Sequence, residues 1–162
     1  MLFRSEEDLD RLGPRYTIAM VDVDHFKRFN DEHGHGVGDQ LLRMIAARLG
    51  ALGGGAQAFR YGGEEFAVLF PDNAVGETMP RLEALRKAIE SVPFVLRAPD
   101  RPQRKPDKPR ARASGRRAVG VTVSIGVAGT DRRRAERAQE VLAAADAALY
   151  RAKRGGRNRI ST

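Results

Sequence analysis

Arg60-Tyr61-Gly62-Gly63-Glu64-Glu65-Phe66 is the most informative segment of this 162-residue chain. Strand-like runs lie on either side of its glycine pair, at residues 56–61 and 65–70. Glycine accepts the positive φ that both central positions of a two-residue hairpin turn need. We therefore expect a tight antiparallel hairpin with Gly62 and Gly63 at its tip and two glutamates directly after them.

A second group of acids follows an apolar run at residues 16–21, which predicts a central strand buried on both faces. Asp22 and Asp24 come at the end of that run. If the hairpin pairs beside this strand, Glu64 and Glu65 converge with them. Gathered carboxylates suit hard cations such as Mg²⁺, and two such ions can activate a hydroxyl and stabilise a leaving pyrophosphate. Taken singly, each acid is better explained as an exposed turn residue, and that explanation weakens when the acids are considered together with Gly62 and Gly63.

The rest of the chain alternates between helical and strand patterns. Helices are predicted at residues 37–49, 82–92 and 141–152, and strands at residues 94–96 and 121–127. This order predicts an α/β fold with a largely antiparallel central sheet flanked by helices. We find no repeat and no sign of a second domain, so residues 1–162 are interpreted as one domain.

Composition excludes several classes of protein. The chain has no cysteine, which rules out disulfides, thiolate metal sites and thiol catalysis and is typical of the cytosol. No apolar run approaches the roughly 20 residues that span a bilayer. Residues 1–15 are charged and lack the apolar core of a signal peptide. We expect a cytoplasmic domain, which a longer protein could still tether to a membrane.

The net charge of +8 is concentrated in one segment. Residues 98–118 are basic and rich in proline, with no aliphatic side chain larger than alanine, and we expect a mobile loop there. A basic loop is more often solvated than bound to nucleic acid, so we expect no specific nucleic-acid partner. A nucleic-acid-binding module is the alternative, and strongly salt-sensitive binding of DNA or RNA would support it.

Other ion and phosphate sites do not match the sequence. A calcium loop starting at Asp22 would place Phe26 where an oxygen ligand belongs and Lys27 where glycine belongs. The three histidines have no zinc spacing, and no Walker-type phosphate loop occurs. A bound phosphate would instead interact with Lys27, Lys153 and Arg157. Lys153 and Arg157 lie at the end of the last predicted helix, where the helix dipole alone would also explain cations.

Four ordered stretches resemble GGDEF-domain diguanylate cyclases, in the variant with glutamate at the third position of the signature. The signature is the segment at residues 60–66. The others are Asp22-Val23-Asp24-His25-Phe26-Lys27 with Asn30-Asp31, Gly34-His35 with Gly38-Asp39, and Ala145-Asp146 through Ala148-Leu149-Tyr150, Ala152-Lys153 and Gly156-Arg157-Asn158. The resemblance extends over residues 16–160.

The resemblance implies a fold like the palm of nucleotide cyclases and polymerases. It also implies a Mg²⁺-dependent reaction, with Mn²⁺ as an alternative, in which two GTP condense to cyclic di-GMP and two pyrophosphates. Each domain would hold one GTP and face a second copy in a transient homodimer. A sensory or dimerising domain is expected upstream in the full-length protein.

The roles of individual residues are likewise carried over from the resemblance. The metal ligands are expected to be Asp22, the Val23 carbonyl, Glu64 and Glu65, and the three acids among them are the expected catalytic residues. Asn30 and Asp39 are expected to recognise guanine, Gly62 and Gly63 to lie against the nucleotide, and Lys27, Lys153 and Arg157 to bind its phosphates.

The sequence departs from the family pattern in two places, of which the first concerns N-terminal packing and the second concerns regulation. Residues 1–15 lack the motif with which the family usually begins. The positions of the family's inhibitory Arg-x-x-Asp site hold Gly53 and Ala56, so we expect no inhibitory product site. A catalytically silent domain, acting as a GTP sensor or a protein-interaction module, remains the alternative interpretation.

Overall fold

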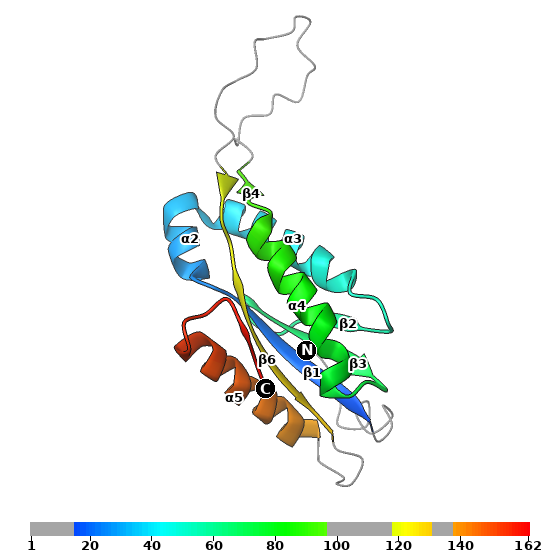
Figure 1. Ribbon diagram of the computed structural model, residues 1–162. Helices are drawn as coiled ribbons and strands as arrows, with labels where there is room; N and C mark the ends of the chain where they lie inside the picture. The colour runs from blue at the N-terminus through cyan, green and yellow to red at the C-terminus, as the bar shows by residue number, and fades with distance from the viewer. Residues whose placement is uncertain (1–14, 97–117, 131–137) are drawn as a thin grey trace, which may run out of the picture.

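The computed structural model describes residues 15–96, 118–130 and 138–162 (Figure 1). Its strands are β1 (Tyr16–Val23), β2 (Gln57–Arg60), β3 (Glu65–Pro71), β4 (Phe94–Val95), β5 (Ala118–Val119), β6 (Val123–Gly129) and β7 (Ile160–Ser161). Its helices are α2 (Phe26–His33), α3 (His35–Gly50), α4 (Val75–Ser91) and α5 (Ala138–Arg154).

The main sheet has the strand order β2-β3-β1-β6-β7. Strand β1 lies in the middle and pairs antiparallel with β3 and with β6, while β7 joins the edge parallel to β6. All eight residues of β1 are buried, because neighbouring strands flank it and helices cover it on both faces. The predicted fold class, a largely antiparallel sheet flanked by helices, is confirmed.

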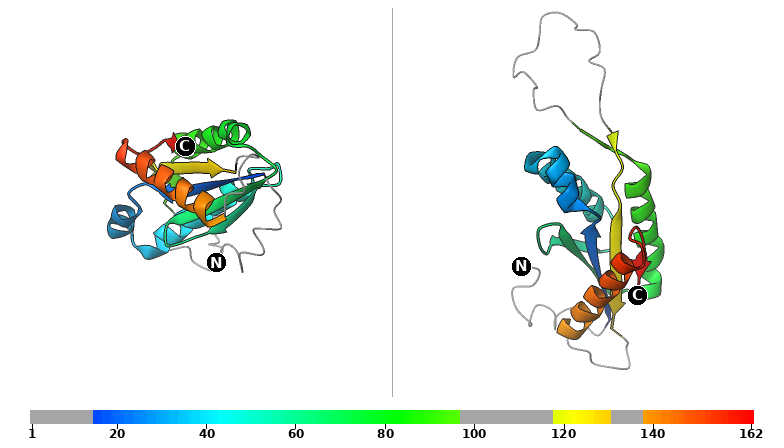
Figure 2. Two further views of the ribbon diagram at one scale, coloured as in Figure 1. Left: turned by 90° about the horizontal axis from the view of Figure 1, so that it is seen from below. Right: turned by 90° about the vertical axis from the view of Figure 1, so that its left-hand side faces the viewer.

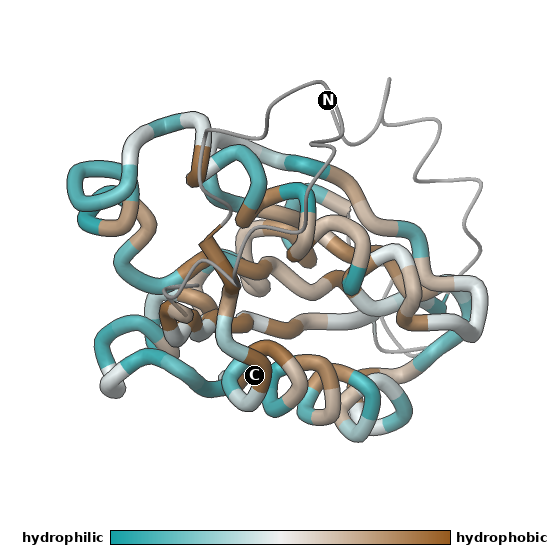
Figure 3. The backbone as a smooth tube through the Cα atoms, turned by 90° about the horizontal axis from the view of Figure 1, so that it is seen from above, coloured by the Kyte–Doolittle hydropathy of each residue, from teal (hydrophilic) through white to brown (hydrophobic). Residues whose placement is uncertain are grey.

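The two faces of the sheet carry separate hydrophobic cores, because side chains alternate along each strand. On one face Val21, Val68 and Ile125 pack with apolar residues of α2, α3 and α4. On the other face Met20 and Leu69 pack with α5. Figure 2 shows the sheet between these two helical layers, and Figure 3 shows hydrophobic residues concentrated along the strands they enclose.

Helix α5 lies unusually close to the sheet at Gly126 of β6. A Cβ on this glycine would lie 2.0 Å from the backbone nitrogen of Leu149 and 2.2 Å from the carbonyl oxygen of Ala145. Any side chain there would push the helix away, since backbone atoms cannot yield as a flexible side chain can. The glycine therefore sets the depth of α5, and with it the position of the lysine at its C-terminal end.

The hairpin forms as predicted between β2 and β3, but its turn is different. Neither Gly62 nor Gly63 has a left-handed φ. Arg60 pairs with Phe66, and the carbonyl of Glu65 accepts from the backbone N–H groups of Tyr61 at 2.8 Å and Gly62 at 3.1 Å. The prediction of a two-residue turn was wrong, because a longer loop reverses the chain without positive φ at its glycines.

Three elements were not predicted. Helix α2 has only two buried residues, Phe26 and Phe29, which is too short an apolar stripe to recognise in sequence. Strand β7 has two residues and depends on β6 for its pairing. Strand β5 pairs with β4 in a separate two-stranded sheet.

Parts of the predictions lie outside the described residues. These are the atypical N-terminal segment before Arg15 and nearly all of the basic loop, whose predicted last residue, Ala118, belongs to β5. Within the described ranges, none of the helices has the length and apolar character needed to cross a membrane.

Candidate active site

Carboxylates from two strands meet at the end of β1. Asp22 and Glu65 are direct partners in the β1–β3 register, so both side chains point to the α5 face of the sheet. The Lys153 ammonium of α5 lies 2.7 Å from Asp22 Oδ2 and 3.8 Å from Glu65 Oε1. The predicted convergence of the hairpin acids with the end of the strand is therefore present in the structure for Asp22 and Glu65.

The carboxylates of Asp22, Glu64 and Glu65 carry more negative charge than the single Lys153 ammonium neutralises. Burial raises the pKa of Asp22, and the neighbouring Glu64 and Glu65 raise it further, while Lys153 lowers it. A buried carboxylate among other carboxylates gains from a nearby cation. Oxygen donors with a deficit of positive charge suit a hard divalent ion, so the donor set fits Mg²⁺. No group of three acidic or histidine side chains is already gathered around one point in the described part of the chain.

Asp24 does not join the cluster. Its carboxylate accepts hydrogen bonds from Thr122 Oγ1 and Ser124 Oγ, both at 2.7 Å, and from the backbone N–H of Asn158 at 3.0 Å. The expectation that Asp24 converges with Asp22 was wrong. The physical reason is that the hydroxyls of Thr122, just before β6, and of Ser124 in β6, together with the segment after α5, already use both of its oxygens.

Asn30 provides an unpaired polar atom. Its side-chain oxygen is buried and, among the described residues, is the only buried side-chain nitrogen or oxygen without a hydrogen-bond partner. A buried acceptor without a donor is unfavourable, which marks a place where a ligand N–H fits. The oxygen lies over Gly38 of α3, where a Cβ would come within 1.8 Å of it. Asp39, the next residue, is exposed beside it.

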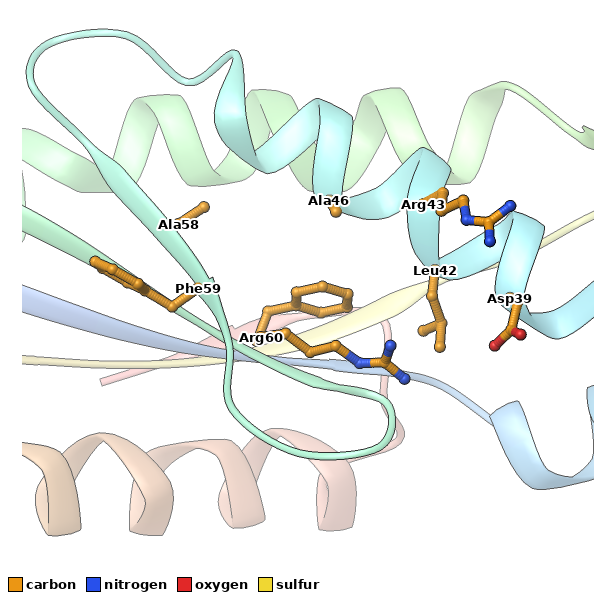
Figure 4. A pocket seen from close by; sticks show the side chains of 8 residues that line it. Asp39, Leu42, Arg43, Ala46, Ala58, Phe59 and Arg60 are labelled. Atoms are coloured by element: carbon orange, nitrogen blue, oxygen red, sulfur yellow. The ribbon is translucent and has the colours of Figure 1, made fainter. Parts of the chain in front are cut away.

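A pocket of about 260 Å³ begins at Asp39 and runs between α3 and β2. Figure 4 shows Leu42, Arg43 and Ala46 of α3 on one side and the residues of β2 on the other. Phe66 forms part of the lining. The pocket thus connects the Asn30–Asp39 corner to the base of the glycine-containing hairpin, and an apolar wall with charged groups at its mouth suits a flat polar base.

Arg60 is a site residue that the sequence analysis missed. It lines the pocket and donates from Nη2 to the Gly63 carbonyl at 2.7 Å and from Nε to the Gly62 carbonyl at 3.2 Å. These bonds hold the hairpin loop against its own first strand. The signal was present in the sequence, since Arg60 directly precedes the loop, but strand alternation alone assigns no role to it.

The remaining predicted residues lie at the same end of the sheet but do not touch the carboxylates in the described contacts. Lys27 is exposed in the first turn of α2, which begins just after β1. Arg157 is exposed three residues beyond α5 and has a left-handed φ of 63°. The backbone N–H of Val23, the last residue of β1, donates to the Glu64 carbonyl of the hairpin at 3.4 Å. Of the three predicted phosphate-binding cations, only Lys153 contacts the acids.

A largely antiparallel α/β sandwich has carboxylates and a lysine at one sheet end, an unpaired amide oxygen on Asn30, and a pocket that begins at Asp39. These are features of a nucleotide-binding domain. The chain belongs to the GGDEF family. The family model described as "Diguanylate cyclase, GGDEF domain" matches residues 4–104 and 103–159.

Named relatives agree with this assignment. The chain is 35% identical over 149 residues to the diguanylate cyclase VdcA of Vibrio cholerae, covering 91% of this chain and 39% of VdcA. It is 34% identical over 163 residues to the response regulator PleD of Caulobacter vibrioides, covering 94% of this chain and 32% of PleD. The chain thus spans between 32% and 39% of the length of these two relatives.

A solved structure is similar over almost the whole chain. It is the GGDEF domain of DgcB from Caulobacter crescentus in complex with c-di-GMP, with 36% sequence identity and a TM-score of 0.77. The match covers 96% of this chain and 86% of the DgcB domain. The likeness therefore includes the sheet end that carries the acids.

Proposed function

We propose that this chain is a diguanylate cyclase domain that condenses two GTP into cyclic di-GMP. The 3′-hydroxyl of each GTP attacks the α-phosphorus of the other, so two P–O bonds form, two α–β phosphoanhydride bonds break, and two pyrophosphates and two protons leave. The observation that carries the proposal is the juxtaposition of Asp22, Glu65 and Lys153 at the sheet end. Membership of the GGDEF family supports it.

The acids would bind the metal and accept the proton of the attacking 3′-hydroxyl. Asp22, the Val23 carbonyl, Glu64 and Glu65 would bind Mg²⁺, or Mn²⁺ in its place. Divalent cations supply charge that stabilises the developing negative oxygens of phosphoryl transfer. One of the two glutamates accepts the proton of the attacking 3′-hydroxyl. Glu65 is half-buried and lies 3.8 Å from Lys153, so its charge is partly offset before substrate binds.

The cations would bind the triphosphate. Lys153 already stands beside the carboxylates, and its ammonium can donate to phosphate oxygens as well as to Asp22. Lys27 and Arg157 lie exposed at the start of α2 and beyond α5, where their side chains are unhindered. Gly62 and Gly63 would let the nucleotide lie against the hairpin, since neither has a side chain in the way.

Guanine recognition predicts a preference for GTP over ATP. The buried Asn30 oxygen and the Asp39 carboxylate accept hydrogen bonds from the guanine N1–H and 2-amino groups, which adenine does not offer at those positions. Leaving such a group unpaired costs about 1–3 kcal/mol. We expect calorimetry to show ATP binding at least tenfold more weakly than GTP, about 1.4 kcal/mol. Equal affinities would contradict the role of the Asn30–Asp39 pair.

Two copies of the domain have to meet during turnover. Each attacking hydroxyl and the phosphorus it attacks belong to different nucleotides, and each domain holds one GTP. The proposal therefore includes a transient homodimer with facing sites. We also propose that residues 1–162 form one domain in the cytoplasm, following a sensory or dimerising domain in the full-length protein, and that it has no specific nucleic-acid partner.

The direct test is to incubate the purified protein with GTP and Mg²⁺ and to follow cyclic di-GMP and pyrophosphate. We expect one cyclic di-GMP for every two pyrophosphates, and none after chelation of the metal. Tight GTP binding without product, in a sample shown to dimerise, would instead identify a catalytically silent GTP sensor.

Product inhibition is expected to be weak and competitive. Gly53 and Ala56 stand where the family's inhibitory site has Arg and Asp, and neither has a charged side chain. The Gly53 carbonyl accepts from Arg81, so this loop is already bound to α4. Charge-assisted bonds supply much of the affinity for an anionic dinucleotide. Initial rates against GTP at several cyclic di-GMP concentrations test this, and tight non-competitive inhibition would refute it.

A further inference from the structure

The turn that follows α5 is held in an unfavourable backbone conformation. Gly156, Arg157 and Asn158 have left-handed φ values of 113°, 63° and 46°. Two of these are not glycine, and such residues adopt left-handed φ only where surrounding contacts compensate its cost. The turn lies between Lys153 of the proposed phosphate site and β7, so whatever holds it also orients the end of α5.

Asn158 makes these compensating contacts through its side-chain oxygen, its side-chain nitrogen and its backbone N–H. The backbone N–H donates to Asp24 Oδ2 at 3.0 Å. The side-chain oxygen accepts from Arg86 Nη1 at 2.7 Å, and the side-chain nitrogen donates to Glu90 Oε1 at 2.8 Å. The turn is thus attached to Asp24, the residue that follows β1, and to α4 through Arg86 and Glu90.

Arg86 is the centre of this arrangement. Its side chain is only 11% exposed and forms two hydrogen bonds to Glu83, at 2.7 and 3.0 Å, besides an ion pair with Glu90 at 2.9 Å. These carboxylates raise the pKa of Arg86, so the guanidinium stays charged. A guanidinium fixed by two carboxylates presents its remaining N–H groups in one direction.

The contacts join layers on opposite faces of the sheet. Helix α4 packs on the face with α2 and α3, and α5 packs on the other face. In Figure 2 the segment after α5 runs from that helix to the side of α4. The Arg159 carbonyl, just beyond Asn158, accepts from the Ile125 N–H at 2.9 Å and fixes the segment to the sheet edge.

We propose that Arg86 is a positioning residue for the phosphate site, acting through Asn158 to hold the turn that carries Arg157 and anchors Lys153 beside Asp22. This inference rests on the proposed function and adds a residue on α4 that is not among the contacts of Asp22 and Glu65 and does not line the pocket between α3 and β2. Removing the Arg86–Asn158 bond lets the turn relax from its left-handed conformation. The cations then lose their alignment with the triphosphate, while the Asn30–Asp39 corner is unaffected.

The test compares ligands with and without phosphates. Arg86→Met and Asn158→Gly each remove the 2.7 Å side-chain bond, and only Asn158→Gly leaves the longer 3.4 Å bond from Arg86 Nη1 to the backbone carbonyl of residue 158. Glycine also keeps the left-handed φ and the backbone N–H to Asp24 available. We expect both variants to bind a non-hydrolysable GTP analogue with Mg²⁺ roughly ten- to a hundredfold more weakly. This is the typical loss when a residue that orients a metal ligand through a hydrogen bond is removed. Guanosine affinity, measured by NMR titration, is expected to stay at the wild-type value.

A matched control and a double variant make the test decisive. Arg81 also lies on α4 and bonds to Asn73 and Gly53 rather than to the turn, so Arg81→Met should leave both affinities unchanged. Arg86→Met combined with Asn158→Gly should weaken binding by less than the sum of the two single effects, because the two changes share the Arg86–Asn158 side-chain bond although Asn158→Gly also removes the bond to Glu90.

Several results would overturn the inference. Equal weakening of guanosine and of the GTP analogue would show a general structural role, and wild-type affinities in both variants would show that the bond positions nothing. Should Arg86→Met fail to fold, Asn158→Gly decides, since it leaves the Arg86–Glu83 pair intact. If the wild-type protein itself does not bind the GTP analogue, the proposed function fails first and the inference with it.

Discussion

Glu65→Ala is expected to abolish cyclic di-GMP synthesis while the domain stays folded. Glu65 faces Asp22 directly across the β1–β3 pair and lies 3.8 Å from Lys153. Removing one carboxylate from a divalent metal site forfeits several kcal/mol of transition-state stabilisation, which is about a thousandfold or more in rate. The assay is production of cyclic di-GMP from GTP and Mg²⁺, followed with a detection limit well below that fraction of wild-type turnover.

The fold should tolerate this change. Glu65 is at the start of β3 and only half-buried, and its loss leaves the 2.7 Å bond between Lys153 and Asp22 intact. We expect a melting temperature within a few degrees of wild type, since about 1 kcal/mol shifts the melting temperature of a chain of this size by roughly 2–8 °C. Glu65→Gln keeps the shape and removes the charge, so it should be similarly inactive.

An exposed acid provides the matched control for charge. Glu32 pairs with Arg28 on the solvent side of α2, and such surface pairs contribute little. Glu32→Ala should therefore retain turnover. Near-wild-type turnover by a folded Glu65→Ala protein would remove Glu65 from the metal site.

Gly38→Ala is expected to weaken GTP binding by roughly five- to a hundredfold, which corresponds to about 1–3 kcal/mol for one lost buried hydrogen bond. A Cβ at this position would lie 1.8 Å from Asn30 Oδ1 and 2.9 Å from Cγ of the same side chain. The asparagine has to rotate away, and its oxygen can no longer accept a hydrogen bond from the base. Isothermal calorimetry with a non-hydrolysable GTP analogue measures the loss.

Gly36→Ala is the control, because it makes the same chemical change two residues earlier in α3. A Cβ at Gly36 meets no atom within 4 Å, and alanine favours a helix by about 1 kcal/mol over glycine. Gly36→Ala should therefore bind the analogue like wild type and melt no lower. If the two variants bind equally well, Asn30 does not need its present orientation, and its assignment to guanine recognition is wrong.

Much of the fold could be predicted because its main elements are encoded locally. The apolar run that becomes β1 and the helical stripes of α3 and α5 depend on residues a few positions apart, which is the range over which periodicity acts. Helix α2 was missed for the same reason, since two phenylalanines in eight residues make no clear stripe.

The turn of the hairpin shows the limit of residue type as a predictor. Glycines permit left-handed φ but do not require it. The bonds from Arg60 to the carbonyls of Gly62 and Gly63, and the pairing of Tyr61 with Glu65, select a longer loop. The sequence indicated where the chain reverses, and hydrogen bonds between the two strands decided how.

By itself the sequence determined the sheet-and-helix architecture, the family, and which charged residues are candidates for the site. Only the tertiary structure decided how those charges are used. Lys153 meets Asp22 across 131 positions of the chain, and Asp24 turns from a candidate ligand into the anchor of Asn158. Such contacts depend on strand register and on the depth of α5 over Gly126, which are set by packing of the whole domain rather than by neighbours in sequence.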